Sequence, residues 1–457
     1  MAGETEKIHA DYTEGSILGS ILKMGLPSMF GFLTQNIYTI VDTWWVSRLP
    51  SGEAAVAGLT FFAVILSLLF SFNQLVGPGS VAVISRRYGE KNYDQTEKAI
   101  KETILLKLLF GFVFGITGYF FTEDLLRLVG ARGESLRLGV QYARIMFVAL
   151  GIPYATYSIF TALRSVANPR MAMILMVVSN LLNMALDPVF IFGYFGFPAL
   201  GIRGAAIASI ISFALTLTAG LVLFYTGRTN LRLHLRGKAA LSLETMWQLV
   251  RIGVPAWLGS VSFTGSRLLI TPMIAMFGTS VVAAYGVGAQ IFGFGIMIII
   301  GIGLGLSSLI GHNLGGGKIE RARKTGDQAI LLSVGIMIVF GAIMFTTAEL
   351  VMGLFFRSPE TIGHGVTLLR IYSLAFPFFG VFLMIEEIHV GVGLNAPMMV
   401  FTVIHSWLLQ VVPVFLITTV FHLNQVAVWW AMMLAGCVTA AMVYAYYRRG
   451  RWLTVKV

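Results

Sequence analysis

Residues 17–47 read ILGSILKMGLPSMFGFLTQNIYTIVDTWWVS, a long apolar run in which Asp42 is the only acid. About 20 predominantly apolar residues are enough for a helix to cross the hydrocarbon core of a bilayer, so this stretch predicts a transmembrane helix. The residues before it are polar and the run is a full span, which argues against a cleavable signal peptide. It also places a carboxylate inside the membrane, where ionisable side chains are rare and indicate function.

The composition of the whole chain supports a membrane protein. Of 457 residues, 57% are hydrophobic and 12% are charged, whereas about a quarter of a soluble domain is charged. An ordinary cytosolic enzyme, a disulfide-stabilised secreted domain and a disordered protein are therefore excluded. The 50 glycines also fit helices that pack closely in lipid. The single Cys437 gives no information about the redox compartment.

Similar apolar stretches recur along the sequence and predict an all-α membrane protein with twelve transmembrane helices. The predicted spans are 17–47, 54–85, 96–121, 135–165, 169–193, 201–226, 246–276, 280–312, 325–349, 362–393, 397–420 and 424–447. A polar linker at 227–245 divides them into an N-lobe (17–226) and a C-lobe (246–447) of six helices each. Residues 1–16 form a polar segment before the first span, and residues 448–457 form a tail after the last.

Lysine and arginine predict the orientation, because they are enriched in cytoplasmic loops. Alternate connections carry most of them, at Arg86, Arg87, Lys91, Lys98, Lys101, Arg164, Arg170, Arg228, Arg232, Arg236, Lys238, Lys318, Arg321, Arg323, Lys324, Arg448, Arg449, Arg451 and Lys456. Both termini are therefore expected in the cytoplasm, with the protein in the plasma membrane. This distribution accounts for most of the net charge of +11, so a nucleic-acid partner is not needed to explain it.

The two halves of the chain repeat each other. LysMetGlyLeuPro at 23–27 matches ArgIleGlyValPro at 251–255, and other matches occur at an offset of roughly 226 residues. Because each half has an even number of spans, the two halves run in the same direction through the membrane. Parallel repeats of this kind form the two lobes of transporters, with a central site between them.

Four acids in the apolar parts of the predicted spans are candidate functional residues, and two of them, Asp42 and Asp187, belong to the N-lobe. Two triplets of polar residues have the spacing i, i+3, i+7, which places each triplet on one helix face: Gln35, Tyr38 and Asp42 in the first span, and Asn180, Asn183 and Asp187 in the fifth. Asp42 lies about 8 Å and Asp187 about 9 Å below the outer end of its span, and Ser209 of the sixth span lies at about 12 Å. Carboxylate, amide and hydroxyl oxygens suit a proton or Na⁺ rather than a soft metal. The alternative is that the two aspartates serve only packing or helix capping.

The C-lobe has no acids at the equivalent positions. It offers Glu386, Glu387 and His389 in the tenth span, which serve either as a second titrating group or substrate contact, or as a hydrated inner rim. Arg267 in the seventh span is a further intramembrane charge whose partner the sequence does not name. Pro27 early in the first span frees a backbone carbonyl and permits a bend, and the hypothesis is that this bend moves during transport.

These motifs resemble the multidrug and toxic compound extrusion (MATE) family over residues 16–447. The resemblance is carried by residues 25–27, residues 36–45 around Asp42, the run 183–188 and GlyAlaAlaIleAlaSer at 204–209. In having a pair of aspartates in the N-lobe, the chain resembles the archaeal and damage-inducible-F-type branch of the family. The family's sixth-helix motif usually ends in threonine, whereas the matching run 204–209 of this chain ends in Ser209.

The resemblance implies two rocking six-helix lobes that export organic cations in exchange for H⁺ or Na⁺. It implies that Asp42, Asn183 and Asp187 couple to the ion, together with Ser209, and that the first three would be the ligands if the ion is Na⁺. The predicted substrate cavity consists of Gln35, Asn36, Tyr38, Tyr142 and Asn180.

The resulting prediction is a secondary antiporter for amphipathic drugs, with membrane lipids around it, no cofactor besides the coupling ion, and a monomeric state. The alternative is a flippase for lipid-linked oligosaccharides or lipids of the same superfamily. A flippase for anionic lipid carriers should have several basic residues in its spans, and Arg267 is the clearest one found. An enzyme is disfavoured because no nucleophile–base or metal-binding motif occurs, and ATP is disfavoured because no nucleotide-binding domain is present.

Overall fold

The computed structural model of the chain describes residues 12–234 and 241–455, and this part is helical, without strands. The remaining parts of the predicted N-terminal segment, linker and tail, at 1–11, 235–240 and 456–457, lie outside the described residues. The prediction of an all-α membrane protein with two lobes is confirmed.

The first half of the chain forms one lobe, in which long helices are interrupted at two places. Its elements are α1 (Ile17–Ser47), α2 (Gly52–Asn73), α3 (Gly77–Gly89), α4 (Tyr93–Phe120), α5 (Thr122–Leu128), α6 (Gly133–Val148), α7 (Gly151–Ser165), α8 (Pro169–Phe192), the 3-10 turn η1 (Tyr194–Gly196) and α9 (Ile202–Tyr225). Ser16 caps α1 by accepting a hydrogen bond from the Gly19 backbone N–H at 3.2 Å, which satisfies one of the free donors at the helix start.

The second half forms the other lobe. Its elements are α10 (Leu243–Ala275), α11 (Thr279–Gly315), α12 (Ile319–Phe355), α13 (Pro359–Val392), α14 (Ala396–Val403), the π-helix η2 (Ile404–Val411), α15 (Val412–Phe415), the π-helix η3 (Leu416–Val420), α16 (Gln425–Arg448) and the 3-10 turn η4 (Arg451–Thr454). The segment Ala396–Val420 makes one continuous span. Its predicted interval, 397–420, did not reveal the two π-helical stretches.

The twelve predicted spans correspond to these elements. Within the described residues, ten helices are long and apolar enough to cross a membrane, and α6 with α7 form an eleventh that is bent by 56°. The remaining predicted span, 246–276, falls on α10, which has 33 residues and is not among the helices that pass by apolar content. The bend between Val148 and Gly151 and the break between α2 and α3 were not predicted, because apolar content alone does not report a change of direction.

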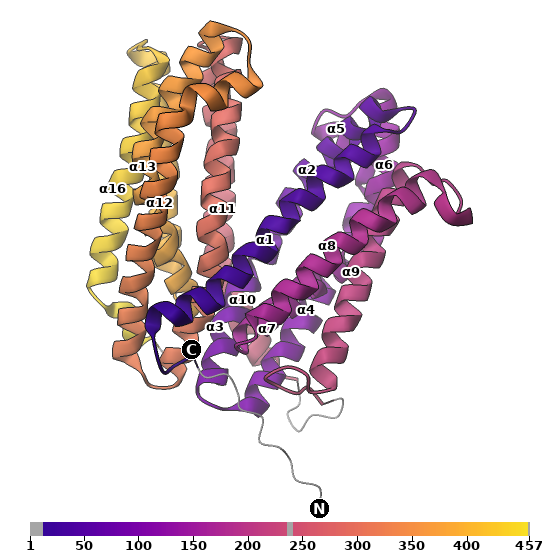
Figure 1. Cartoon of the computed structure of the whole chain (residues 1–457), viewed down its shortest axis with the longest axis vertical. Coiled ribbons are helices and arrows are strands. Elements are labelled where there is room, and N and C mark those ends of the chain that lie inside the picture. Colours follow the sequence, from indigo (N-terminus) through magenta and orange to yellow (C-terminus); the bar gives the residue numbers. More distant parts are fainter. Residues whose placement is uncertain (1–11, 235–240, 456–457) are drawn as a thin grey trace, which may run out of the picture.

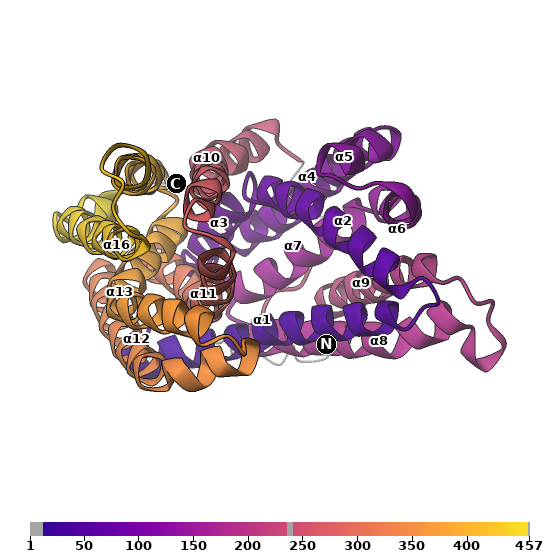
Figure 2. The same cartoon turned by 90° about the horizontal axis from the view of Figure 1, so that it is seen from above.

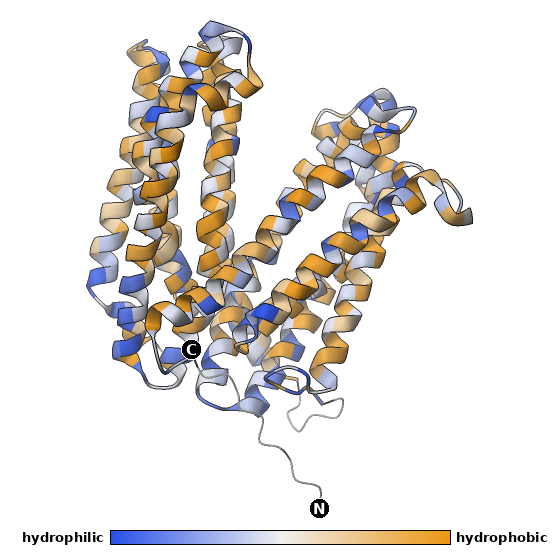
Figure 3. Cartoon of the chain, viewed as in Figure 1, coloured by the Kyte–Doolittle hydropathy of each residue, from blue (hydrophilic) through white to orange (hydrophobic). Residues whose placement is uncertain are grey.

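The two lobes meet at one end of the molecule, called the closed end here, and diverge toward the other, the open end (Figure 1). The view from above shows α1, α2, α6, α8 and α9 on one side and α11, α12, α13 and α16 on the other (Figure 2). Hydrophobic residues cover most of the length of the helices, and hydrophilic residues gather toward their ends (Figure 3). The start of α1 and the end of α16 both lie at the closed end.

Glycines bring the helices of the two lobes into direct backbone contact at the closed end. A Cβ on Gly305 of α11 would lie 2.5 Å from the Met24 carbonyl of α1, and one on Gly25 of α1 would lie 3.1 Å from the Ile302 Cα of α11. Small residues permit this approach, which is the usual way in which helices associate in lipid. The contact therefore depends on the absence of side chains at these positions.

The same contact is repeated by the equivalent residues of the other half. Gly79 of α3 corresponds to Gly305, and a Cβ on it would lie 2.1 Å from the Leu249 carbonyl oxygen of α10. Gly253 of α10 corresponds to Gly25, and a Cβ on it would lie 2.1 Å from the Leu75 carbonyl oxygen. The closed end is thus joined by two related contacts, one made by α1 with α11 and one made by α3 with α10.

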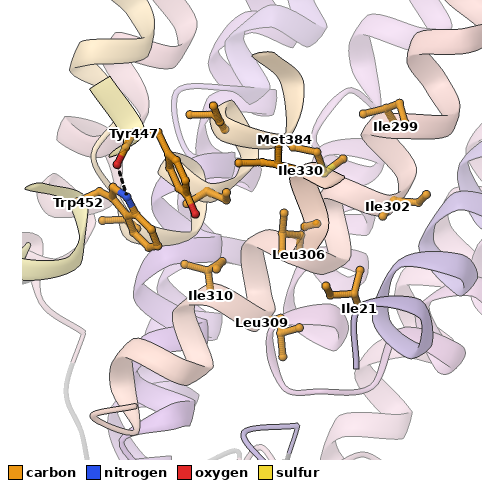
Figure 4. Close-up of a cluster of buried hydrophobic side chains, with 14 of the residues drawn as sticks. Ile21, Ile299, Ile302, Leu306, Leu309, Ile310, Ile330, Met384, Tyr447 and Trp452 are labelled. Carbon is orange, nitrogen blue, oxygen red and sulfur yellow. Dashed lines mark hydrogen bonds between the residues drawn. The ribbon is translucent and has the colours of Figure 1, made fainter. Parts of the chain in front are cut away.

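An apolar cluster and a set of polar bonds complete this end. Ile21 of α1 is buried against Ile302, Leu306 and Leu309 of α11 (Figure 4). Before α1, the backbone oxygen and hydroxyl of Thr13 accept hydrogen bonds from the Lys318 ammonium at 3.2 and 2.7 Å. The start of the N-lobe is therefore fixed to the C-lobe on both sides of the α1 N-cap.

We expect Gly305→Ala to lower the free energy of unfolding by about 1–3 kcal/mol, because the added methyl group overpacks a backbone contact. Gly286→Ala in the same helix is the control, since nothing lies within 4 Å of a Cβ at that position, and its effect should stay within about 0.5 kcal/mol. Thermal unfolding of the purified variants, followed by size-exclusion chromatography, measures the difference. Equal stability of the two variants would contradict the proposed role of the glycine contact.

Candidate functional site

The two N-lobe aspartates come from neighbouring helices and lie at matching depth. Asp42 is five residues from the end of α1 and Asp187 is five residues from the end of α8, which is about 8 Å in each case. Asp42 is 7% exposed and Asp187 is fully buried. Their carboxylates are close enough for their charges to interact. The structure therefore places the two aspartates near each other at matching depth, and their role in ion coupling stays a prediction.

Asn183 and Ser209 lie beside this pair. In one orientation of the Asn183 amide, both its nitrogen and its oxygen have partners. The amide nitrogen then donates to Asp187 Oδ2 at 3.1 Å, and the amide oxygen accepts from the Ser209 hydroxyl at 3.1 Å and from the Ser209 backbone N–H at 3.0 Å. Asn183 thus connects α8 to α9 and holds one oxygen of Asp187. The amide and the hydroxyl each have a definite partner, so the polar face predicted for the fifth span is a hydrogen-bonded network.

Two tyrosines close the site. The Tyr38 hydroxyl lies 3.4 Å from Ser209 Oγ, and both Tyr38 and Tyr142 lie near the two carboxylates. The ring of Tyr142 is 5% exposed and packs edge-on against Phe62, with 5.5 Å between the ring centroids. Since these hydroxyls are the polar neighbours of the acids, the structure groups Tyr38 and Tyr142 with the acid pair.

The other predicted cavity residues lie elsewhere. Asn180 donates to the Thr34 hydroxyl at 3.0 Å, which joins α8 to α1 one turn away from Asn183. Asn36 points toward the other lobe, and its amide nitrogen lies 3.1 Å from the Met297 sulfur of α11. Gln35 is partly buried on α1. The partner of Asn180, Thr34, was missed because a lone threonine in an apolar span carries no sequence signal.

The donor set of the N-lobe site suits a small hard cation. Asp42 Oδ1 and Asp187 Oδ1 are buried without a hydrogen-bond partner, and a buried charged oxygen without a partner is costly. A proton on either carboxylate, or a Na⁺ shared by Asp42, Asp187 and Asn183, removes that cost. No cluster of three or more His, Cys, Asp or Glu residues that could hold a metal occurs among residues 12–234 and 241–455. The oxygen donors of the N-lobe site are hard ligands, which do not suit a soft transition metal.

A separate cavity of about 540 Å³ lies between the two lobes. Its walls carry aromatic and methionine side chains from both lobes, among them Phe32, Tyr157, Phe160, Met176, Phe263, Phe379, Phe382, Met398 and Met399. Pockets of about 300–1,000 Å³ accommodate drug-sized ligands. None of the five residues predicted to line the substrate cavity, Gln35, Asn36, Tyr38, Tyr142 and Asn180, is among the residues that line this one.

Charged side chains of both signs face this central cavity. Glu386 and Glu387 of α13 line it from the C-lobe, and Lys107 of α4 and Arg164 of α7 line it from the N-lobe. Sequence reasoning placed Arg164 among the loop charges and overlooked Lys107. A single lysine inside the apolar run 104–114 was the signal that could have found it.

His389 is separated from the two glutamates that were grouped with it. It is fully buried, its Nδ1 lies 2.8 Å from the Ile385 carbonyl oxygen, and its ring packs against Tyr446 of α16 at a centroid distance of 5.8 Å. It does not line the central cavity. His389 packs between α13 and α16, whereas Glu386 and Glu387 line the central cavity.

Comparisons with known proteins agree on the family. The family model described as MatE matches residues 27–189 and 255–416. The probable multidrug resistance protein YoeA of Bacillus subtilis is 27% identical over 93% of this chain and 92% of its own length. The multidrug export protein MepA of Staphylococcus saprophyticus is 25% identical over 97% and 96%. The outward-facing structure of a multidrug resistance MATE family transporter has the same fold, with a TM-score of 0.86, 24% identity and 96% coverage of both chains.

We expect Asn183→Ala to lower the free energy of unfolding by about 1–3 kcal/mol, because Asp187 Oδ2 loses its buried donor. In an Asp187→Asn background the cost should shrink, since the residue at 187 is no longer a carboxylate. Thermal unfolding of the two single variants and the double variant measures this coupling. Asn180→Ala, one turn away, is the control that should show no coupling to position 187, and additive costs for Asn183→Ala would contradict the network.

Proposed function

Because the chain belongs to the MatE family of membrane transporters, we propose that it exports amphipathic organic compounds by secondary active antiport. It is a transporter and not an enzyme. The inward-moving ion, H⁺ or Na⁺, binds the acid pair Asp42 and Asp187, and the exported compound binds in the cavity between the lobes. The observation that carries the proposal is the burial of two neighbouring carboxylates in the N-lobe, each with an oxygen that lacks a hydrogen-bond partner.

The names of the relatives support the substrate class. YoeA and MepA are described as multidrug resistance and multidrug export proteins. The central cavity of this chain has the aromatic and methionine walls that suit bulky, varied ligands. We therefore assign it organic compounds of drug size.

The distribution of basic residues supports an orientation. The connections that carry many of the lysines and arginines, among them those after α3 and after α11, lie at the closed end, which the positive-inside rule places in the cytoplasm. In the proposed orientation both termini are cytoplasmic, and the lobes diverge toward the outside. This is the state in which a compound leaves and a coupling ion enters.

Helix α1 provides a physical connection between the ion site and the closed end. Asp42 lies near its open end, while Met24 and Gly25 near its start contact α11 of the C-lobe. A cation at the acid pair removes the repulsion between two carboxylates, and each charge that moves inward contributes about 2.3 kcal/mol per 100 mV of membrane potential. A movement of α1 caused by ion binding at Asp42 would therefore also move the part of α1 that contacts α11 at the closed end.

One observation favours the flippase as a second candidate. Lys107 and Arg164 place two basic groups in the central cavity, where an anionic lipid carrier would need them. Glu386 and Glu387 on the facing wall repel such a carrier. Because both signs of charge are present, the cavity is less suited to a purely anionic lipid than to a drug.

We expect Asp42→Asn to reduce gradient-driven efflux of rhodamine 123 from proteoliposomes at least about tenfold, because an amide cannot exchange a proton or balance Na⁺ in the same way. A pH gradient and a Na⁺ gradient are imposed separately, so that the gradient that drives wild-type transport identifies the ion. Asp94→Asn, at an exposed position at the start of α4, is the control and should transport normally. Full transport by Asp42→Asn would move the coupling site elsewhere, and no transport of any organic dye, cationic or zwitterionic, by the wild type would favour the flippase.

We expect Pro27→Ala to slow transport several-fold while leaving rhodamine binding unchanged. Proline lacks the N–H that would bond the Lys23 carbonyl, and Pro27 lies on α1 between the closed-end contact and the acid pair. Alanine restores the bond and stiffens the helix at this point. Initial rates in proteoliposomes and binding to the same preparations separate the two effects, and normal transport by Pro27→Ala would exclude a moving bend.

A further inference from the structure

The central cavity has a positive wall on one lobe and a negative wall on the other. Lys107 is 2% exposed and Arg164 is 7% exposed, and both belong to the N-lobe. Glu386 and Glu387 are partly buried and belong to the C-lobe. All four line the same cavity of about 540 Å³.

These charges are not neutralised by direct ion pairs. Among the ion pairs of residues 12–234 and 241–455 none includes Lys107, Arg164, Glu386 or Glu387. The Arg164 guanidinium donates to the Thr161 hydroxyl at 3.3 Å. Glu387 interacts with the Ser307 hydroxyl, and its other oxygen, Oε2, is buried without a partner. The charges of Arg164 and Glu387 interact across the cavity, without contact.

Within each wall, the two charged side chains have the same sign and repel each other. Lys107 and Arg164 are close enough to repel each other, and Glu386 repels Glu387. A buried charge that lacks a partner costs several kcal/mol, so both walls gain from a ligand that brings the opposite charge. A purely cationic ligand satisfies the glutamates alone and is repelled by the basic wall.

We propose that the preferred substrates are zwitterionic aromatic amphiphiles, a refinement that rests on the proposed export function. Their cationic group lies against Glu386 and Glu387, and their anionic group lies against Lys107 and Arg164. The aromatic body lies between them, against rings such as Phe160 and Phe379. This assignment gives each of the four charges a partner.

The two walls belong to different lobes, and this has a consequence for release. When the lobes move relative to each other, the distance between the basic wall and the acidic wall changes. A ligand that bridges both walls then loses one of its two charged contacts, whereas a ligand held by a single wall does not. Bridging thus couples affinity to the position of the lobes.

A matched pair of dyes tests the proposal. Rhodamine 110 carries a cationic ring system and a free carboxylate, and rhodamine 123 is its methyl ester, which keeps the cation and lacks the anion. Binding to the full-length protein in lipid nanodiscs is measured by fluorescence polarisation without any ion gradient. We expect the wild type to bind rhodamine 110 at least about tenfold more tightly than rhodamine 123, since a buried charged contact is worth about that much.

The variants assign the two ends of the ligand. Lys107→Met and Arg164→Gln should each weaken rhodamine 110 binding about tenfold and leave rhodamine 123 binding equal or stronger. Glu387→Gln should weaken both dyes. Lys324→Met, at an exposed position of α12, is the control and should change neither. Retained rhodamine 123 binding shows that the Lys107→Met and Arg164→Gln proteins are folded.

Three results would overturn the proposal: equal affinity for the two dyes, tighter binding of rhodamine 123, or no change of the affinity ratio in Lys107→Met and Arg164→Gln. The last result would mean that the four charges only attract the lobes to each other. Because binding is measured without a gradient, a failure here leaves gradient-driven export of rhodamine 123 intact as a separate result. Conversely, absent transport combined with the expected dye preference would remove the antiport and keep the ligand assignment.

Discussion

The contact between glycine-bearing helices at the closed end is the constraint on which the arrangement of the lobes depends. Lipid tails are as apolar as the helix surfaces, so helices in a bilayer associate through close packing and not through a hydrophobic driving force. Gly25 and Gly305 give α1 and α11 that packing, and Gly79 and Gly253 give it to α3 and α10. Because the two contacts are related by the internal repeat, the lobes are joined by two equivalent helix–helix contacts. The rest of each lobe is free to diverge from this end.

The cost of charge in a low-dielectric interior explains why the polar residues are so unevenly placed. In the N-lobe, one oxygen of Asp187 is held by Asn183, while Asp42 Oδ1 and Asp187 Oδ1 have no partner. In the central cavity the charges of Arg164 and Glu387 face each other without contact. In both places, the protein itself supplies no partner for some of the buried charged groups. We propose a small cation for the first place and a larger ligand with two charges for the second.

Much of the N-lobe site could be predicted, because the spacing of its polar residues along each helix determines which of them share a face. The i, i+3, i+7 pattern placed Tyr38 and Asp42 on one face of α1 and Asn183 and Asp187 on one face of α8, and the direction of the spans set their depth. The same reasoning failed for the central cavity. Its lining depends on which faces of α4, α7 and α13 meet across the lobes, and on the 56° bend between α6 and α7. Arg164, near a predicted loop, therefore looked like a surface charge.

In the proposed mechanism, the position of Asp42 on α1 allows one lobe to bind the ion for the whole molecule. Helix α1 is continuous from Ile17 to Ser47, so its two ends are mechanically connected through the backbone. Its open end carries Asp42, and its closed end is packed between the N-lobe and α11. No acid of the C-lobe needs to lie at the equivalent of Asp42, because α10, the repeat partner of α1, makes the corresponding contact with α3. In the proposed cycle the ion therefore acts on only one of the two related contacts, the one that α1 makes with α11.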